Sequence, residues 1–254
     1  MQKYYFLATA LPTISLKARS DISFEELKFM FEVNLSASDL NKAILFKRYI
    51  DITNLRLLWL SKEIDPRGNL NTAELEDVLL IRDVFPDFVF DFLDRYETTE
   101  DRLKNFSFLT SSFFNEIINK ERGFLKFYFK FERELRLVIA ALRAKKMRKD
   151  LLKEFQFEDP KDEFVAYIIA QKDMEVFEPP KEYEKVKNIY KKYINDPKAM
   201  HIALLEYKFK QIEMFSEKKP FTMDQILAYA TQLIIVEDFF KLNEDKGREQ
   251  IETL

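Results

Sequence analysis

The residue types that most often catalyse reactions or bind metals are scarce in this sequence. The chain has no cysteine, one histidine and three glycines among 254 residues. Without cysteine there are neither disulfides nor thiolate ligands for zinc. Three scattered glycines cannot form a phosphate-cradling loop or the glycine-rich turn of a dinucleotide site. The sequence therefore predicts no cofactor and no metal, and it indicates no catalytic residue.

The single histidine, His201, is the first remaining candidate for acid-base chemistry. It lies between Met200 and Ile202 in a helical pattern. A histidine with apolar neighbours and no nearby nucleophile is more often a structural or surface residue than a catalytic one. We therefore assign His201 no catalytic role.

One loop resembles the register of a calcium-binding loop. Positions one, five, seven and twelve of that register are occupied by Asp65, Asn69, Asn71 and Glu76. Position three is Arg67, however, and position six, which requires glycine, is Leu70. Both departures fall where coordination and backbone geometry are demanding, so we expect no calcium site here.

The sharpest charge feature is a basic cluster at the end of a long helical pattern. Its members are Arg143, Lys145, Lys146, Arg148, Lys149 and Lys153. Cations at a helix C-terminus are favoured by the helix dipole, and this alone explains them. The alternative is a surface that contacts an acidic partner. Because the net charge is −3 and the pI about 5.6, we expect no nucleic-acid binding.

Carboxylates are frequent between Glu74 and Asp101. Such a run is typical of solvated helix faces, and an acidic contact surface is the alternative. Acidic and basic side chains are therefore separated along the chain. Separation of this kind suits a protein that contacts other proteins.

Two long amphipathic helices are predicted to position these groups. The first, over Ser38–Ile64, carries the only tryptophan, Trp59, on a wide apolar face that we expect to be buried. On this helix the residues predicted to form an opposing polar row are Lys47, Asp51 and Asn54. The second helix, over Phe124–Met147, buries a stripe through Leu135. On the second helix the residues predicted to point away are Lys126, Lys130, Arg133 and Arg136.

The whole pattern predicts an all-α fold, a multi-helix bundle of about ten helices, because glycine and proline are few and helix formers abundant. Residues 4–16 are expected to form an extended strap or a short helix. The other predicted helices cover residues 23–34, 71–85, 86–96, 98–117, 160–172, 181–194, 197–216 and 222–242. We expect a single domain over 1–254, with lobes 1–122 and 123–243 as the alternative and a polar tail over 244–254.

No transmembrane helix is expected. The longest uncharged run, Tyr4–Leu16, is broken by Pro12 and is shorter than the ~20 residues of a membrane span. A weak likeness of this run to a signal peptide leaves secretion as the less favoured alternative. The absence of cysteine suits a reducing cytoplasm.

The first long helix resembles a known family. Its run Asp51-Ile52-Thr53-Asn54-Leu55 is similar to a helix of the C subunit of V/A-type ATP synthases, the equivalent of the eukaryotic d subunit. The segment Leu142–Lys145 and the closing Ala228-Tyr229 pair with Lys246-Gly247 look like later parts of that family. The opening Tyr5–Pro12 resembles a bacterial branch of unknown function encoded beside V-type ATP synthase genes. The chain departs from the family at Leu233 and Val236, where Lys and Glu are usual.

This resemblance implies a non-catalytic central-stalk adaptor with pseudo-repeated lobes. Its partners would be the central shaft and the rotor ring, and it would lie at the cytoplasmic membrane face, held there through these proteins. The rival hypothesis is a generic all-helical interaction scaffold with an unknown partner. A third hypothesis is an enzyme that uses carboxylates alone. It is disfavoured because the sequence shows none of the usual arrangements of catalytic acids, bases and nucleophiles.

Overall fold

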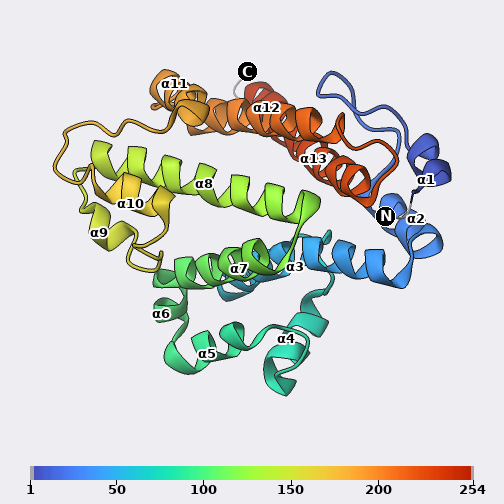
Figure 1. Cartoon of the computed structure of the whole chain (residues 1–254), viewed down its shortest axis with the longest axis horizontal. Coiled ribbons are helices and arrows are strands. Elements are labelled where there is room, and N and C mark those ends of the chain that lie inside the picture. The colour runs from blue at the N-terminus through green and yellow to red at the C-terminus, as the bar shows by residue number, and fades with distance from the viewer. Residues whose placement is uncertain (1–2, 253–254) are drawn as a thin grey trace. The chain divides into compact units, whose positions relative to one another are not determined.

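The computed structural model describes residues 3–252, with side chains described for residues 3–243. Over these residues the protein is all-helical, as predicted, with thirteen α-helices and no strand (Figure 1). The helix bounds are α1 Tyr5–Ala10, α2 Phe24–Asn34, α3 Ala37–Trp59, α4 Thr72–Ile81, α5 Asp87–Arg95, α6 Thr99–Lys104, α7 Phe106–Lys120, α8 Gly123–Lys146, α9 Leu151–Glu154, α10 Glu163–Ile169, the 3-10 turn η1 Lys181–Tyr183, α11 Glu184–Lys192, α12 Pro197–Ser216 and α13 Met223–Glu252. None of the described helices is long and apolar enough to cross a membrane.

The chain forms two compact units. The middle unit comprises residues 31–129, and the terminal unit comprises residues 1–30 together with 130–254. Both α2 and α8 begin in one unit and end in the other.

The middle unit is built around α3 and α7, which pack together, and α7 also contacts α5 (Figure 1). Aromatic rings fill the core between them. Tyr49 stacks on Phe113 at 5.6 Å between ring centroids, and Phe113 meets Phe129 edge-on at 5.0 Å. Such pairs add specific geometry to the burial of apolar surface. The sequence is rich in phenylalanine because this core uses large, flat side chains.

The polar row predicted on α3, opposite its apolar face, does not meet solvent. The side chains of Lys47, Asp51 and Asn54 are all buried. Residues 65–70, which precede α4, cover this face of the helix. Asn54 donates to the carbonyl of Asp65 and accepts from its N–H, both at 2.9 Å. These polar groups are buried because the loop supplies their hydrogen bonds.

Trp59 is half-buried rather than buried. It stacks on Phe92 at 6.0 Å and receives the guanidinium of Arg102 at 5.8 Å from its ring. The apolar face that was predicted to be buried is therefore only partly covered at Trp59. Trp59 is the last residue of α3, and the chain turns two residues later at Ser61, which has a positive φ.

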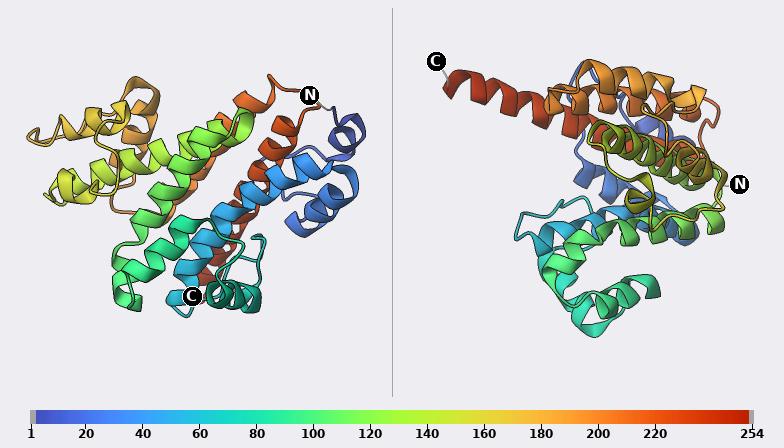
Figure 2. Two further views of the ribbon diagram at one scale, coloured as in Figure 1. Left: turned by 60° about the horizontal axis from the view of Figure 1, so that its bottom comes forward. Right: turned by 90° about the vertical axis from the view of Figure 1, so that its left-hand side faces the viewer.

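The terminal unit has its own apolar core. The α8 stripe through Leu135 and Val138 is buried, as predicted. It packs with residues from α9, α10 and α11, including Val165 and Val186. The helices α12 and α13 pack along each other, and α13 continues as one long helix (Figure 2). It extends ten residues beyond the predicted end at Leu242.

Local signals located several helix ends correctly. Ser23 and Glu26 form the predicted capping box, with the Ser23 N–H donating to Glu26 at 2.7 Å. Asn71 and Glu74 form the second one. Thr98 caps α6, but the single helix expected over residues 98–117 is divided at Asn105 into α6 and α7.

Candidate interaction site

The predicted basic cluster surrounds the turn that joins α8 to α9. Arg143, Lys145 and Lys146 occupy the last turn of α8, and the other members follow its end. The helix ends in a Schellman motif, in which Lys149 N–H donates to the carbonyl of Ala144 at 2.8 Å and Arg148 N–H to that of Lys145 at 3.1 Å. The sequence position of the cluster thus coincides with a defined backbone turn.

Arg148 occupies the left-handed position of this motif, with φ of 53°. Glycine is the usual residue there because a Cβ is strained in that conformation. The turn therefore carries an arginine where backbone geometry alone would favour glycine.

Replacing Arg148 with glycine should raise the free energy of unfolding by about 1 kcal/mol, because it relieves the left-handed strain. Thermal unfolding followed by circular dichroism measures the change. Lys149→Gly is the matched control, since Lys149 has no positive φ and gains nothing. A destabilised Arg148→Gly protein would show that the arginine side chain holds the turn.

Two members of the cluster serve the fold. Lys145 donates to the carbonyls of Lys172 and Met174 at 2.6 and 2.5 Å and so fixes the segment after α10. Lys149 pairs with Glu154 at 3.1 Å. The sequence could not separate these lysines from their neighbours because their partners come from later turns of the chain.

Three other members are available for contacts. Lys146, Arg148 and Lys153 are exposed, and none of them has an ion-pair partner among the residues that the structure describes. Met147 and Leu152, which are 57% and 47% exposed, lie between them in the sequence. Apolar side chains flanked by unpaired cations are what a contact surface for an acidic protein needs. We call these five residues the basic surface.

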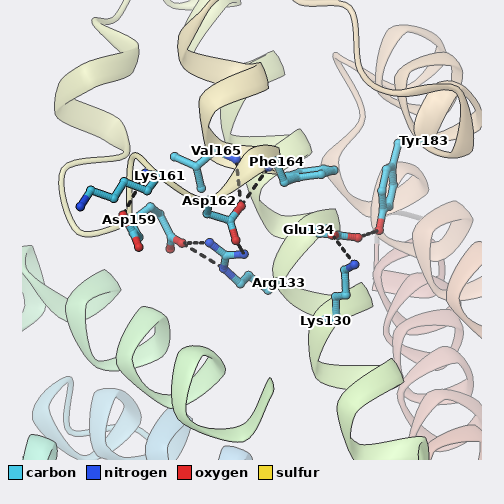
Figure 3. Close-up of polar contacts among 10 residues, drawn as sticks. Lys130, Arg133, Glu134, Asp159, Lys161, Asp162, Phe164, Val165 and Tyr183 are labelled. Atoms are coloured by element: carbon cyan, nitrogen blue, oxygen red, sulfur yellow. Dashed lines mark hydrogen bonds and ion pairs between the residues drawn. The ribbon is translucent and has the colours of Figure 1, made fainter. Parts of the chain in front are cut away.

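A buried ion-pair network fixes the elements beside this surface (Figure 3). Arg133 of α8 donates to Glu158 at 2.7 and 3.0 Å and to Asp162 at 3.0 Å. The other oxygen of Asp162 caps α10 by accepting from the N–H groups of Phe164 and Val165. Burial opposes the charge of Arg133, but Glu158 and then Asp162 outweigh it and hold its pKa above the usual value. Arg133 was predicted to point away from the apolar stripe of α8, and the structure shows that its side chain is nevertheless buried.

A second polar contact joins α8 to η1 (Figure 3). The hydroxyl of Tyr183 donates to Glu134 at 2.8 Å, and Lys130 lies 3.7 Å from the same carboxylate. Burial raises the pKa of Glu134 despite these partners. Burial, followed by the charge of Glu134, raises the pKa of Tyr183. Carboxyl groups that act as acid catalysts often have a raised pKa. The carboxylate of Glu134, however, already accepts a hydrogen bond from the buried hydroxyl of Tyr183.

Other ionisable groups are engaged in similar pairs. Lys208 of α12 lies 2.8 Å from both oxygens of Glu132 on α8. His201 lies exposed on α12. Within the described part of the chain, no group of three or more histidines or carboxylates is arranged to hold a metal.

The side chains of the calcium-like register have separate roles. Asp65 pairs with Arg67 at 2.7 Å, and Asn69 donates to Asp51 at 2.6 Å. Asn71 caps α4. Of these side chains, that of Asn69 therefore contacts α3.

The fold and the site define an all-helical protein with a group of exposed cations and apolar side chains after α8. A family model matches residues 1–254, and the chain belongs to this family, described as "Protein of unknown function (DUF2764)". The chain is 29% identical to an uncharacterized protein of Chlamydia muridarum, over 99% of this chain and 97% of that protein. With the same coverage, it is 31% identical to an uncharacterized protein of Chlamydia pneumoniae. No solved structure matches the chain.

This result overturns the resemblance to the V/A-type ATP synthases. The family model that covers the whole chain is described only as a protein of unknown function, and neither it nor these relatives carry an ATP synthase name. In this structure the side chains of Asp51 and Asn54, which carried the resemblance, both bind the loop before α4. The partners implied by the resemblance, the rotor ring and the central shaft, lose their basis with it.

Proposed function

We propose that this protein is a non-catalytic scaffold that binds other proteins through its helical surfaces. The observation that carries the proposal is the basic surface, where exposed Met147 and Leu152 lie among cations without ion-pair partners in the described chain. Interfaces of proteins combine an apolar centre with a charged rim in this way. The partner we infer is a protein with an acidic contact surface.

Neither nucleic acid nor an anionic membrane suits the basic surface as well. Both require a broad basic field, because affinity rises with the number of phosphates neutralised. Lys145 and Lys149 are committed to internal contacts, and the net charge of the whole chain is −3. The small basic field that remains fits a protein partner.

The carboxylate-enzyme hypothesis finds less support. The largely buried carboxylates of Glu132, Glu134 and Glu158 are bonded to Lys208, Tyr183 and Arg133, each of which comes from a different segment of the chain. These pairs account for the buried charge without a reaction. We infer a role in binding, and the lack of cysteine suits a reducing compartment such as the cytoplasm.

Reversing Lys146 and Lys153 to glutamate should remove one or more partners from the tagged protein purified from native cells. With a partner in hand, we expect association to slow by about tenfold and its dependence on salt to flatten. Quantitative mass spectrometry and stopped-flow binding measure the two effects. The circular dichroism spectrum should not change, because both lysines are exposed.

The matched control reverses Lys210 and Lys218, which are exposed in the same unit and carry the same charge. This variant should keep every partner. If both variants bring down the same proteins at the same level, the basic cluster only stabilises a helix end and the proposal fails.

A further inference from the structure

The turn between α4 and α5 carries an unusual group of exposed aliphatic side chains. Leu80, Ile81 and Val84 are 80%, 70% and 51% exposed, within five consecutive residues. Single exposed apolar residues are common on protein surfaces, but several together mark contact sites. The packing of the middle unit does not explain their exposure, since Leu75, Val78 and Phe85 are the buried apolar residues of this segment.

The backbone of the turn is strained and firmly held. Arg82 and Val84 have φ of 61° and 65°, and Phe85 N–H donates to the Asp83 carbonyl at 2.6 Å across Val84. A β-branched residue in this region is an outlier, and a γ-turn of this hand is rare.

Two arginines fix the turn. Arg48 of α3 donates to the carbonyl of Val84 and stacks over Phe85 at 5.4 Å. Arg82 pairs with Asp94 of α5. The aliphatic side chains are therefore presented by an ordered backbone, which lowers the entropy lost when a partner binds.

The surroundings of the turn are strongly acidic. Residues 74–101 contain ten carboxylates and two arginines. Of the arginines, Arg82 is paired with Asp94, and Arg95 lies over the rings of Tyr96 and Phe108. Glu76 and Asp77 are exposed on α4, one helical turn before the exposed aliphatic residues.

We propose that this surface binds a basic amphipathic helix of a partner protein. The acidic–apolar surface comprises Glu76, Asp77, Leu80, Ile81, Val84 and Asp87. Its aliphatic centre would accept the apolar face of the helix, and its carboxylates would pair with lysines or arginines on either side. An anionic membrane or a nucleic acid would be repelled by the same carboxylates.

This inference goes beyond the proposed function, because it adds a second surface of opposite charge on the other unit. A scaffold with both surfaces can hold an acidic and a basic partner at once. A second copy of the chain is a less suitable occupant. Contact between its basic surface and this one would be head-to-tail, and such contacts extend into filaments unless they close into a ring.

The test uses the full chain and a synthetic helical peptide of about eighteen residues, with leucines at i, i+3, i+4 and i+7 and lysines on the remaining face. Isothermal titration calorimetry should show that the wild-type chain binds the peptide. The variant Leu80→Ser/Ile81→Ser should bind it with about tenfold lower affinity, and Asp77→Lys/Asp87→Lys should lower the affinity by a similar factor. Both variants should keep the wild-type circular dichroism spectrum, since all four side chains are exposed.

Two matched controls separate this site from general charge attraction. Met147→Ser/Leu152→Ser removes comparable apolar exposure from the basic surface and should leave the affinity unchanged. A peptide of the same composition with scrambled leucines should bind at least about tenfold more weakly, because it has no apolar face.

Several results would overturn the proposal. If the scrambled peptide bound equally well, or if Leu80→Ser/Ile81→Ser kept full affinity, the carboxylates of residues 74–101 would be explained as solvated helix faces without a partner. Co-sedimentation with vesicles containing phosphatidylserine would indicate a membrane surface. Sedimentation velocity that shows concentration-dependent assembly, lost in the Asp77→Lys/Asp87→Lys variant, would identify a second copy as the occupant.

Discussion

Replacing Arg133 with alanine should lower the free energy of unfolding by about 3 to 5 kcal/mol. The guanidinium is 5% exposed and makes three hydrogen bonds to Glu158 and Asp162. Its removal leaves the buried carboxylate of Glu158 without this cation. It also frees Asp162, whose other oxygen caps α10. The loss combines the removal of this cation from a buried carboxylate with a weakened helix start.

Urea denaturation followed by circular dichroism measures this effect. Lys130→Ala is the matched control on the same helix, because Lys130 is exposed and lies 3.7 Å from its partner. It should change stability by less than about 0.5 kcal/mol. Arg133→Lys should fall between the two, since an ammonium keeps the charge but cannot contact both carboxylates with a planar fork. A loss under about 1 kcal/mol for Arg133→Ala would mean that water replaces the guanidinium.

Arg133 also illustrates what the sequence could not predict. Periodicity placed it correctly on the face of α8 opposite Leu135, and polar residues on such a face normally meet solvent. The segment after α9 returns to cover that face, bringing Glu158 and Asp162 with it. No local pattern around residue 133 indicates a partner 25 or 29 positions later.

Signals that depend on a few neighbouring residues were reliable. The capping boxes at Ser23 and Asn71 need only a residue three positions away, and both are present. The helical class follows from composition and periodicity in the same local way. The basic cluster could be predicted only in part. The sequence located its charges but not the partners of Lys145 and Lys149 within the chain.

The two proposed contact surfaces also differ in how well the sequence predicts them. The cations after α8 stand out in the sequence. The acidic–apolar surface depends on Leu80, Ile81 and Val84, which any pattern would place in a hydrophobic core. Their exposure follows from the left-handed residues Arg82 and Val84, which turn the chain before α5. Tertiary structure alone distinguishes these three from the buried Leu75 and Val78.

Replacing Gly68 with alanine should destabilise the middle unit by about 3 kcal/mol, through overpacking and lost hydrogen bonds. A Cβ at residue 68 would lie 2.5 Å from Asp51 Oδ1 and 3.3 Å from Asn54 Nδ2. Backbone conformation is not the cause, since Gly68 has no positive φ. The carboxylate cannot move aside without cost. Its oxygens accept from Asn69 N–H and Nδ2 at 2.6 Å and from Leu70 N–H at 3.2 Å.

A double-mutant cycle isolates this contact. The fluorescence of Trp59, the only tryptophan and a residue of the middle unit, reports unfolding of that unit in urea. Asp51→Ala alone should also destabilise the unit, because the N–H groups of Asn69 and Leu70 lose their acceptor. In that background Gly68→Ala meets no carboxylate and should cost at least about 1 kcal/mol less than in the wild type. Equal costs in both backgrounds would show that Gly68 is required for another reason than its approach to Asp51.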